Sequence, residues 1–323
     1  MSKPILEIED LTVQYRIESR YLTAVDDVSF AINAGDALGI VGESGSGKST
    51  LAFAVLGILP ENARVTSGRV LFEGRDLLQM SEAEVRREVR WKKISMIFQS
   101  SMNALNPVYR VGSTLADVAR YKEGLSQSEA EKKVASLYEL VGIDPSRMRS
   151  YPHQYSGGMK QRAVIAMSLI CKPVLILADE PTTALDVVVQ DQILKKLKEL
   201  QKELGISFIL ISHDVGVIGA ACERVAVMYG GKVFEMGFTK ELFSEPNNPY
   251  TRALLQCFPD LKNPKKRLKG IPREISEVAM STTGCLFAPR CAYAKDICRS
   301  NAPPMHEVKP GHFSLCHFAK ELV

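Results

Sequence analysis

The feature that most constrains this chain is a glycine-rich loop, GESGSGKST, at residues 42–50. It matches the pattern G-x-x-x-x-G-K-[ST] and lies between a predicted strand, Asp36–Val41, and a helical run, Leu51–Leu59. In such a loop the glycines let backbone N–H groups turn inward around a phosphate, and the helix that follows adds partial positive charge. The pattern therefore predicts a phosphate-binding loop in a layered α/β core.

The residue types of this loop suit a nucleotide and its metal ion. The Lys48 ammonium is expected to bridge the β- and γ-phosphate oxygens, and the Ser49 hydroxyl to ligate Mg²⁺. The residues predicted to contact the nucleotide here are Gly42, Ser44, Gly45, Ser46, Gly47, Lys48, Ser49 and Thr50.

A second apolar run, Val174–Ala178, ends in two adjacent carboxylates, Asp179 and Glu180. An acid at the end of such a strand typically holds Mg²⁺ through water, which is the role predicted for Asp179. Glu180 is predicted to polarise a water for in-line attack on the γ-phosphate. Alone, the two acids could merely cap the exposed end of a buried strand. The phosphate loop earlier in the chain favours the catalytic interpretation.

The rest of the chain fits the same layered core. Buried strands are predicted at Ile94–Phe98 and Ser207–Ile211, antiparallel strands at Leu6–Tyr15 and Ala24–Ile32, and a hairpin around Gly230-Gly231. Nine of the 16 prolines follow residue 240, so we place a domain boundary near residue 245. The predicted domains are residues 1–245, which bind the nucleotide, and residues 246–323, a C-terminal extension.

Composition narrows the class of protein. The 323 residues are 46% hydrophobic and 24% charged, which excludes collagenous and disordered chains. A net charge of +4 is too small to indicate nucleic-acid binding. The apolar runs fall far short of the roughly 18 residues that a membrane-spanning helix needs. The first ten residues lack a secretory leader pattern, so we expect the chain in the cytosol with reduced cysteines.

Four of the seven cysteines lie close together, at Cys285, Cys291, Cys298 and Cys316. Four thiolates in about thirty residues suit either a [4Fe–4S] cluster or tetrahedral Zn²⁺. The spacing lacks the C-x2-C knuckles common in zinc modules, which favours iron–sulfur over zinc. The third alternative is four free buried thiols, because free cysteine packs well as a small apolar residue.

The segment YSGGMKQR at residues 155–162 resembles the LSGGQ-type signature of the ATP-binding-cassette (ABC) ATPases. In this family, residues matching Ser156, Gly157 and Gly158 offer hydroxyl and N–H donors to the nucleotide held by the opposite subunit. The resemblance implies a head-to-tail dimer that closes on two ATP molecules. It also implies a RecA-like P-loop core with an N-terminal antiparallel β subdomain and an α-helical signature subdomain at about residues 100–165, followed by the small cysteine-containing domain.

Three more positions match motifs of this family. Gln99 corresponds to the Q-loop glutamine, which reaches Mg²⁺ and the attacking water. Asp186 corresponds to the D-loop aspartate, although Thr183 stands where many members carry serine. His213 corresponds to the switch histidine that contacts the γ-phosphate.

The adenine-stacking aromatic residue of the family is assigned to Tyr15, which ends the first predicted strand. Tyr21 is the competitor, because the loop between the two tyrosines is long.

The extension points to one branch of the family. The segment NPYTRALL at residues 248–255 resembles the HPYTRALL element of oligopeptide/dipeptide importer ATPases, with Asn248 in place of the usual histidine. The cysteine spacing, the Pro-Arg pair before Cys291 and Pro303-Pro304 also match this branch. The resemblance therefore implies an ATPase that powers import of di- or oligopeptides.

The same resemblance implies partners and a location. These are two transmembrane permeases, a second ABC ATPase in a heterodimer rather than a homodimer, an extracytoplasmic substrate-binding protein that acts indirectly, and no nucleic acid. The chain would lie peripherally on the cytoplasmic face of the inner membrane. Nickel and oligosaccharide importers use very similar ATPases and stay open as alternatives. A soluble ABC ATPase acting on ribosomes or DNA fits less well, because the chain has one phosphate loop and no sustained heptads.

Overall fold

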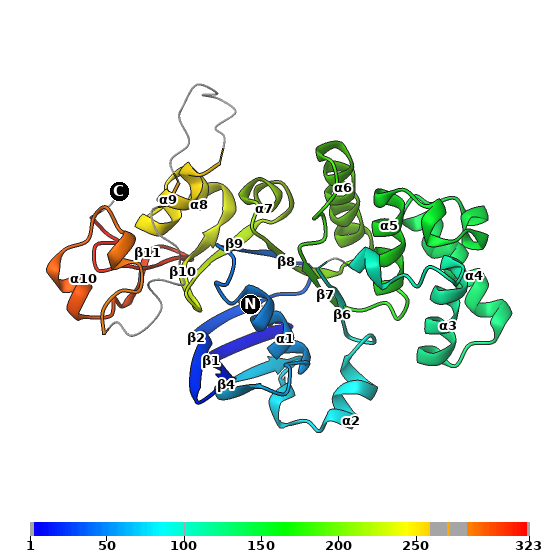
Figure 1. Cartoon of the computed structure of the whole chain (residues 1–323), viewed down its shortest axis with the longest axis horizontal. Coiled ribbons are helices and arrows are strands. Elements are labelled where there is room, and N and C mark those ends of the chain that lie inside the picture. The colour runs from blue at the N-terminus through cyan, green and yellow to red at the C-terminus, as the bar shows by residue number, and fades with distance from the viewer. Residues whose placement is uncertain (1–2, 100, 259–269, 272–282, 322–323) are drawn as a thin grey trace. The chain divides into compact units, whose positions relative to one another are not determined.

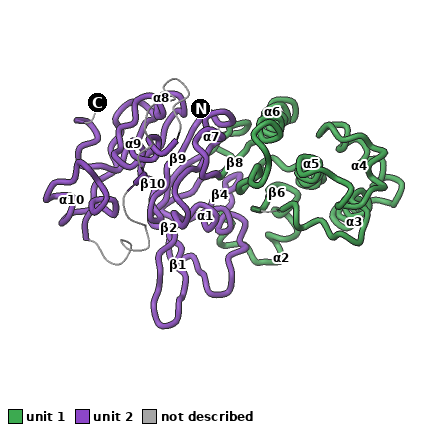
Figure 2. The backbone as a smooth tube through the Cα atoms, turned by 45° about the horizontal axis from the view of Figure 1, so that its top comes forward, with its two compact units in different colours: residues 1–5, 32–37, 76–211 green, residues 6–31, 38–75, 212–323 purple. Residues whose placement is uncertain are grey.

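The structure is a computed structural model that describes residues 3–99, 101–258, 270–271 and 283–321. The chain divides into two compact units, which Figure 2 colours separately. Unit 1 comprises residues 1–5, 32–37 and 76–211, and unit 2 comprises residues 6–31, 38–75 and 212–323. The two units do not correspond to the two domains predicted from the sequence, so the domain boundary after residue 245 stays a prediction.

Unit 1 contains three parallel strands in the order β8-β7-β6. They span Ser207–Ser212, Leu175–Asp179 and Ile94–Ile97. Every residue of β7 and β8 is buried, as the continuous apolar runs predict for a parallel sheet. Helix α6 (Val187–Leu204) buries one apolar stripe that includes Ile193 and Leu197, and Gly205 caps its C-terminal end in a left-handed conformation.

The helical part of unit 1 is formed by α3 (Val111–Glu123), α4 (Gln127–Leu140) and α5 (Gly157–Ser168), which Figure 1 shows as one group. A reciprocal capping box between Ser126 and Glu129 begins α4. These helices occupy the range predicted for the signature subdomain.

Unit 2 contains an antiparallel sheet in the order β2-β1-β4-β5. Strand β1 (Leu6–Ile17) pairs with β4 (Ala63–Phe72), and its buried side chains alternate with partly exposed ones. Strand β2 spans Arg20–Ile32. Both β1 and β2 are longer than the sequence predicts, because the chain turns directly from one to the other at residues 18–19.

The second sheet region of unit 2 begins at β3 (Ala37–Val41), which is fully buried and pairs in parallel with β9 (Arg224–Tyr229). The predicted hairpin joins β9 to β10 (Lys232–Phe238). Strand β10 then pairs with β12 (His312–Leu315), and β12 with β11 (Met305–Lys309). The C-terminal residues therefore extend this sheet region.

The remaining elements connect these strands and helices. They are α1 (Lys48–Leu56), β5 (Arg75–Asp76), α2 (Glu82–Glu84), α7 (Val215–Ala221), α8 (Thr239–Ser244), α9 (Pro249–Gln256) and α10 (Asp296–Ser300), with single turns η1 (Leu77–Gln79), η2 (Val85–Val89), η3 (Ser101–Ala104), η4 (Pro145–Arg149), η5 (Pro152–Gln154) and η7 (Ala288–Arg290). Among the helices of the described residues, none has the length and apolar character needed to cross a membrane.

Candidate functional site

The phosphate loop joins β3 to α1 in unit 2. The helix begins at Lys48 rather than at the predicted Leu51, because Gly47 adopts a left-handed φ of 98° and serves as its N-cap. The Lys48 ammonium donates to the carbonyl oxygens of Gly42 at 2.9 Å and Glu43 at 2.7 Å, and to Ser46 Oγ at 3.1 Å. Lys48 is 7% exposed, so its charge is enclosed by the loop itself.

Close packing explains two of the loop's glycines. A Cβ atom at Gly42 would lie 2.1 Å from the carbonyl oxygen of Met228, and one at Gly47 would lie 2.1 Å from that of Ala24. Both neighbours are backbone atoms and cannot rotate aside. The loop therefore requires glycine for its contacts with β2 and β9 as well as for its φ angles.

Tyr15 shares a hydrogen bond of 3.2 Å with Thr50, the last residue of the loop motif. Tyr21 instead is 54% exposed, and its ring lies under the Arg64 guanidinium at 4.7 Å. Of the two tyrosines considered for adenine stacking, the structure thus joins Tyr15 directly to the loop.

The strand-end carboxylates lie in unit 1. Asp179 is the last residue of β7 and is 2% exposed. Glu180 follows with a φ of 48°, which is uncommon for a residue with a Cβ atom and is typical of constrained functional positions. Its N–H donates to the Ile211 carbonyl of β8 at 2.9 Å, which fixes the backbone at this turn.

Two donors orient the Glu180 carboxylate. Gln99 Nε2 donates to Glu180 Oε2 at 3.0 Å, and the Thr183 hydroxyl donates to the same oxygen at 2.9 Å. The structure therefore brings together two residues that the sequence places far apart, Gln99 and Glu180. No role is predicted for Thr183 from the sequence. The position of its hydroxyl, three residues after an acid at a strand end, could have predicted this contact.

The signature residues lie at the start of α5 in unit 1. Ser156 is the N-cap, and its Oγ accepts a hydrogen bond from the Met159 N–H at 3.2 Å. Ser156 and Gly157 are exposed, whereas Gly158 is buried. A Cβ atom at Gly158 would lie 2.6 Å from Val189 of α6.

Asp186 and His213 occupy the ends of other elements. Asp186 is the N-cap of α6, where its Oδ1 accepts from the Val189 N–H at 2.9 Å. His213 is exposed and lies between β8 and α7, just before the cap residue Asp214. His213 and the phosphate loop lie in unit 2, whereas Gln99, Asp179, Glu180, the signature and Asp186 lie in unit 1.

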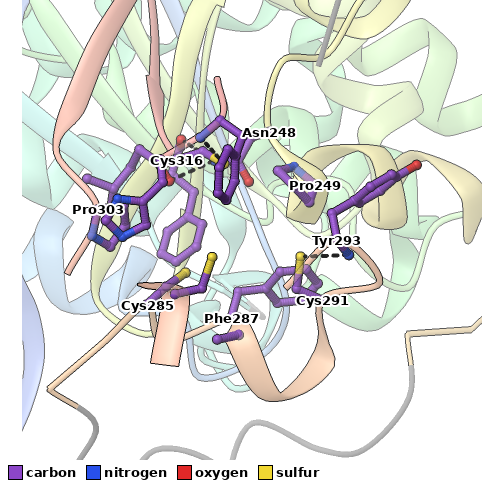
Figure 3. A pocket seen from close by; sticks show the side chains of 14 residues that line it. Asn248, Pro249, Cys285, Phe287, Cys291, Tyr293, Pro303 and Cys316 are labelled. Atoms are coloured by element: carbon purple, nitrogen blue, oxygen red, sulfur yellow. Dashed lines mark hydrogen bonds between the residues drawn. The ribbon is translucent and has the colours of Figure 1, made fainter. Parts of the chain in front are cut away.

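The four clustered cysteines line one pocket in unit 2, together with Asn248 and Phe287. Figure 3 shows Cys285 and Cys291, which flank the η7 turn, and Cys316, which follows β12, around this pocket. The Tyr293 N–H donates to Cys291 Sγ and the Phe318 N–H to Cys316 Sγ, each at 3.4 Å. Four cysteine side chains thus line one pocket, and two of their sulfurs accept hydrogen bonds from backbone N–H groups.

Burial makes these thiols reluctant to ionise. Burial, with the neighbouring thiols as a further cause, raises the pKa of Cys285 to about 11. Burial also raises the pKa values of Cys291 and Cys316. A metal ion would therefore have to displace protons. Within the part of the chain that the structure describes, no group of three or more His, Cys, Asp or Glu residues is arranged to hold a metal ion.

Asn248, which replaces the histidine of the branch motif, has a structural role. It caps α9 by accepting from the Tyr250 N–H at 3.0 Å. Its amide donates to the carbonyl oxygens of Phe234 and Leu315 at 2.9 and 3.1 Å. Asn248 thus ties β10 to the C-terminal hairpin.

The sequence did not predict a buried histidine–glutamate pair near this junction. His312 Nε2 lies 2.8 Å from Glu235 Oε1, and the exposures of the two residues are 1% and 0%. Their separation of 77 residues explains why no local pattern joins them.

Comparisons with known proteins agree on one family. Residues 25–183 match the family model described as ABC transporter, and residues 234–298 match the one described as oligopeptide/dipeptide transporter, C-terminal region. The chain is 43% identical to the oligopeptide transport ATP-binding protein OppD of Salmonella typhimurium, covering 97% of this chain and 93% of the relative. It is 41% identical to the dipeptide transport ATP-binding protein DppD of Escherichia coli, covering 97% and 96%.

Solved structures agree with this similarity. A dimeric structure of the ATP-binding cassette MJ0796, in a post-hydrolysis state bound to ADP and phosphate, matches with a TM-score of 0.65 and 27% identity. The match covers 72% of this chain and 98% of that one.

Proposed function

Because the chain belongs to the ATP-binding proteins of ABC transporters, in the oligopeptide/dipeptide branch, we propose that it hydrolyses ATP to power import of di- or oligopeptides. The observation that carries the catalytic part is the fixed Glu180 carboxylate, held by Gln99 and Thr183 at the end of a buried strand. The proposal of a peptide substrate depends on the similarity of the C-terminal region to the oligopeptide/dipeptide branch and not on the nucleotide site.

The phosphate loop binds the ATP phosphates. Lys48 and the loop N–H groups, with the start of α1, supply the positive charge that this anion needs. Tyr15 stacks on adenine, a role supported by its hydrogen bond to Thr50. His213 contacts the γ-phosphate, as the switch histidine of the family does.

The Ser49 hydroxyl, the Asp179 carboxylate and Gln99 would hold Mg²⁺, because all three offer oxygen donors of the kind that this ion prefers. When bound, Mg²⁺ neutralises charge that develops on the phosphates. Glu180 accepts the proton of the attacking water, and Gln99 keeps its carboxylate in place.

The signature serves a second subunit. Ser156, Gly157 and Gly158 donate to the nucleotide of a partner ATPase, and Asp186 lies at that interface. The exposure of Ser156 and Gly157 supports this role. ATP closes the dimer and hydrolysis reopens it, which moves two permease subunits between their states.

The assembly is a membrane complex. The chain lies peripherally on the cytoplasmic face of the inner membrane, pairs with a second ABC ATPase, preferably a different one, and depends indirectly on an extracytoplasmic binding protein.

The C-terminal cysteines would hold a [4Fe–4S] cluster, with Zn²⁺ as the alternative metal. Four sulfurs in one pocket and two N–H donors to sulfur support this assignment. Anaerobic purification followed by iron, sulfide and zinc analysis tests it. A chain free of all three after anaerobic purification would contradict it.

Glu180→Gln tests the catalytic role. We expect the variant to bind ADP as the wild type does and to lose ATP hydrolysis by at least about a hundredfold, because glutamine cannot take the proton. Glu203→Gln, an exposed change on α6 in the same unit, is the control. Undiminished hydrolysis by the Glu180 variant would show that the base lies elsewhere.

A further inference from the structure

An arginine from the cysteine-containing segment contacts the phosphate loop. Arg290 ends the η7 turn and directly precedes Cys291. Its Nη1 donates to Glu43 Oε2 at 2.9 Å and to the Tyr229 hydroxyl at 3.3 Å. The Arg290 side chain is 3% exposed and that of Glu43 is 22% exposed. Since Glu43 is the second residue of the phosphate loop, this ion pair joins positions 247 residues apart at the nucleotide-binding loop.

A tyrosine holds the backbone of the same residue. The Tyr250 hydroxyl accepts a hydrogen bond from the Glu43 N–H at 3.1 Å, and Tyr250 is fully buried. Its ring packs against those of Tyr229 and Phe287, with centroids 4.6 and 5.3 Å away. The main chain of Glu43 is therefore held by Tyr250 and its carboxylate by Arg290, two residues that come after strand β10 in the chain.

The charge of Glu43 makes this contact relevant to nucleotide binding. A carboxylate within a phosphate loop repels the phosphates of a nucleotide, and the repulsion is strong where water is partly excluded. The phosphate-loop motif accepts any residue at this position, so the motif itself does not require an acid. A buried guanidinium paired with that acid cancels its charge and fixes its direction.

We propose that Arg290 is a positioning residue for nucleotide binding: it neutralises and orients Glu43, so that affinity for nucleotide depends on the C-terminal segment. The inference rests on the proposed role of the phosphate loop. Arg290 lies between Cys285 and Cys291 in the sequence, but the proposed function of its side chain is in the ATP site and not in the cysteine pocket.

The test measures ADP affinity of the full chain by calorimetry, because ADP avoids turnover. Arg290→Met is expected to weaken ADP binding about tenfold by leaving the Glu43 charge uncompensated. Adding Glu43→Gln to that variant is expected to restore most of the affinity, since the repelling charge is gone. Such non-additivity is the signature of two groups that act through each other.

Ionic strength gives a second readout. The loss in Arg290→Met should shrink as salt is raised, because mobile ions screen the repulsion between Glu43 and the phosphates. A role confined to holding the fold together would produce neither the rescue nor this salt dependence.

Lys309→Met is the matched control, because it removes a cation from an exposed ion pair with Glu245 in the same unit. Its ADP affinity should equal that of the wild type. Arg290→Lys keeps the positive charge and is a second variant in case Arg290→Met does not fold. If both variants fold, the ADP affinity of Arg290→Lys should lie between that of the wild type and that of Arg290→Met. If only Arg290→Lys folds, its ADP affinity should be weaker than that of the wild type.

Three results would overturn the inference. They are wild-type affinity in Arg290→Met, wild-type affinity in Arg290→Lys where only that variant folds, and a loss that Glu43→Gln does not recover. A wild-type chain that fails to bind ADP would overturn the proposed function first and this inference with it.

Discussion

The phosphate loop and the signature loop both carry glycines and both precede a helix, but they differ in the charge that they enclose. The phosphate loop encloses its own cation, with Lys48 7% exposed and Ser46 fully buried. The signature loop presents an exposed Ser156 and Gly157 at the start of α5, and the first three residues of that helix, Gly-Gly-Met, include no cation. The N–H groups of a helix N-terminus can hold an anion by themselves, and a cation enclosed beside them adds positive charge to that site. The phosphate loop therefore encloses a cation within its own motif, which the signature loop does not.

The two loops are nevertheless supported in the same way, by buried tyrosines. Tyr250 accepts from the backbone of the phosphate loop. Tyr155, directly before Ser156, donates to the Arg147 carbonyl at 2.8 Å and shares a hydrogen bond of 3.1 Å with Tyr138. The phosphate loop is thus held from about 200 residues away, and the signature is held by its own subdomain.

Lys48→Ala should have the largest effect on nucleotide binding by the phosphate loop. We expect ADP affinity to fall at least about a hundredfold, because the charged donor to the phosphates is lost while the helix N-terminus remains. Calorimetry measures the affinity, with exposed Lys202→Ala as the control. A change of only a few-fold would show that the loop does not rely on its cation.

Gly157→Glu should impair the signature loop and leave the phosphate loop intact. A carboxylate at the start of α5 would repel a nucleotide presented by the partner, so hydrolysis by the assembled dimer should fall about a hundredfold. ADP affinity of the single chain should be unaffected. A Cβ atom at this position would lie 3.2 Å from the flexible Leu185 side chain, which can shift to permit the substitution. Equal loss of both properties would place the signature in its own chain's nucleotide site.

Ser156→Ala and Ser126→Ala compare two helix caps in unit 1. Each removes an Oγ that accepts from the third N–H of its helix, so each should lower the free energy of unfolding by about 1 kcal/mol. Only Ser156→Ala should also slow hydrolysis. Chemical denaturation and an ATPase assay measure the two effects, and equal activity in both variants would reduce Ser156 to a cap.

Alkaline pH should weaken the supports of both loops. Burial raises the pKa values of Tyr138, Tyr155 and Tyr250 above the value of 10.0 expected in the unfolded chain. Their contribution to stability is complete below about pH 10 and is lost as the pH rises above it, because the unfolded chain then ionises more readily.

Tyr138→Phe should make that alkaline loss shallower, at a cost near neutral pH of about 1 kcal/mol for the lost hydrogen bond. Thermal unfolding at a series of pH values measures both. An unchanged slope in Tyr138→Phe would mean that other groups control alkaline unfolding.

Sequence reasoning predicts the strands and the phosphate loop well because both depend on local patterns. Continuous apolar runs identify β3, β7 and β8, and the glycine pair identifies the β9–β10 turn. The start of α1 is misplaced by three residues because the left-handed Gly47 acts as the cap.

Contacts between distant residues could not be predicted in the same way. The ion pair of Arg290 with Glu43 and the pair of His312 with Glu235 arise only when the extension folds onto strands formed earlier in the chain. The Pro-Arg pair before Cys291 matches the branch, but that resemblance gives no role to the arginine. The fold was therefore more predictable than the support of its site.

The terminal hairpin has a consequence for how these chains meet one another. Strand β12 covers the side of β10 that would otherwise present unpaired backbone groups, and β11 becomes the outer strand. An uncovered strand invites pairing with another chain, and charged side chains discourage it. Glu307 and Lys309 lie on β11. The sheet region therefore ends in a short outer strand with charged side chains, which discourages edge-to-edge pairing with another chain.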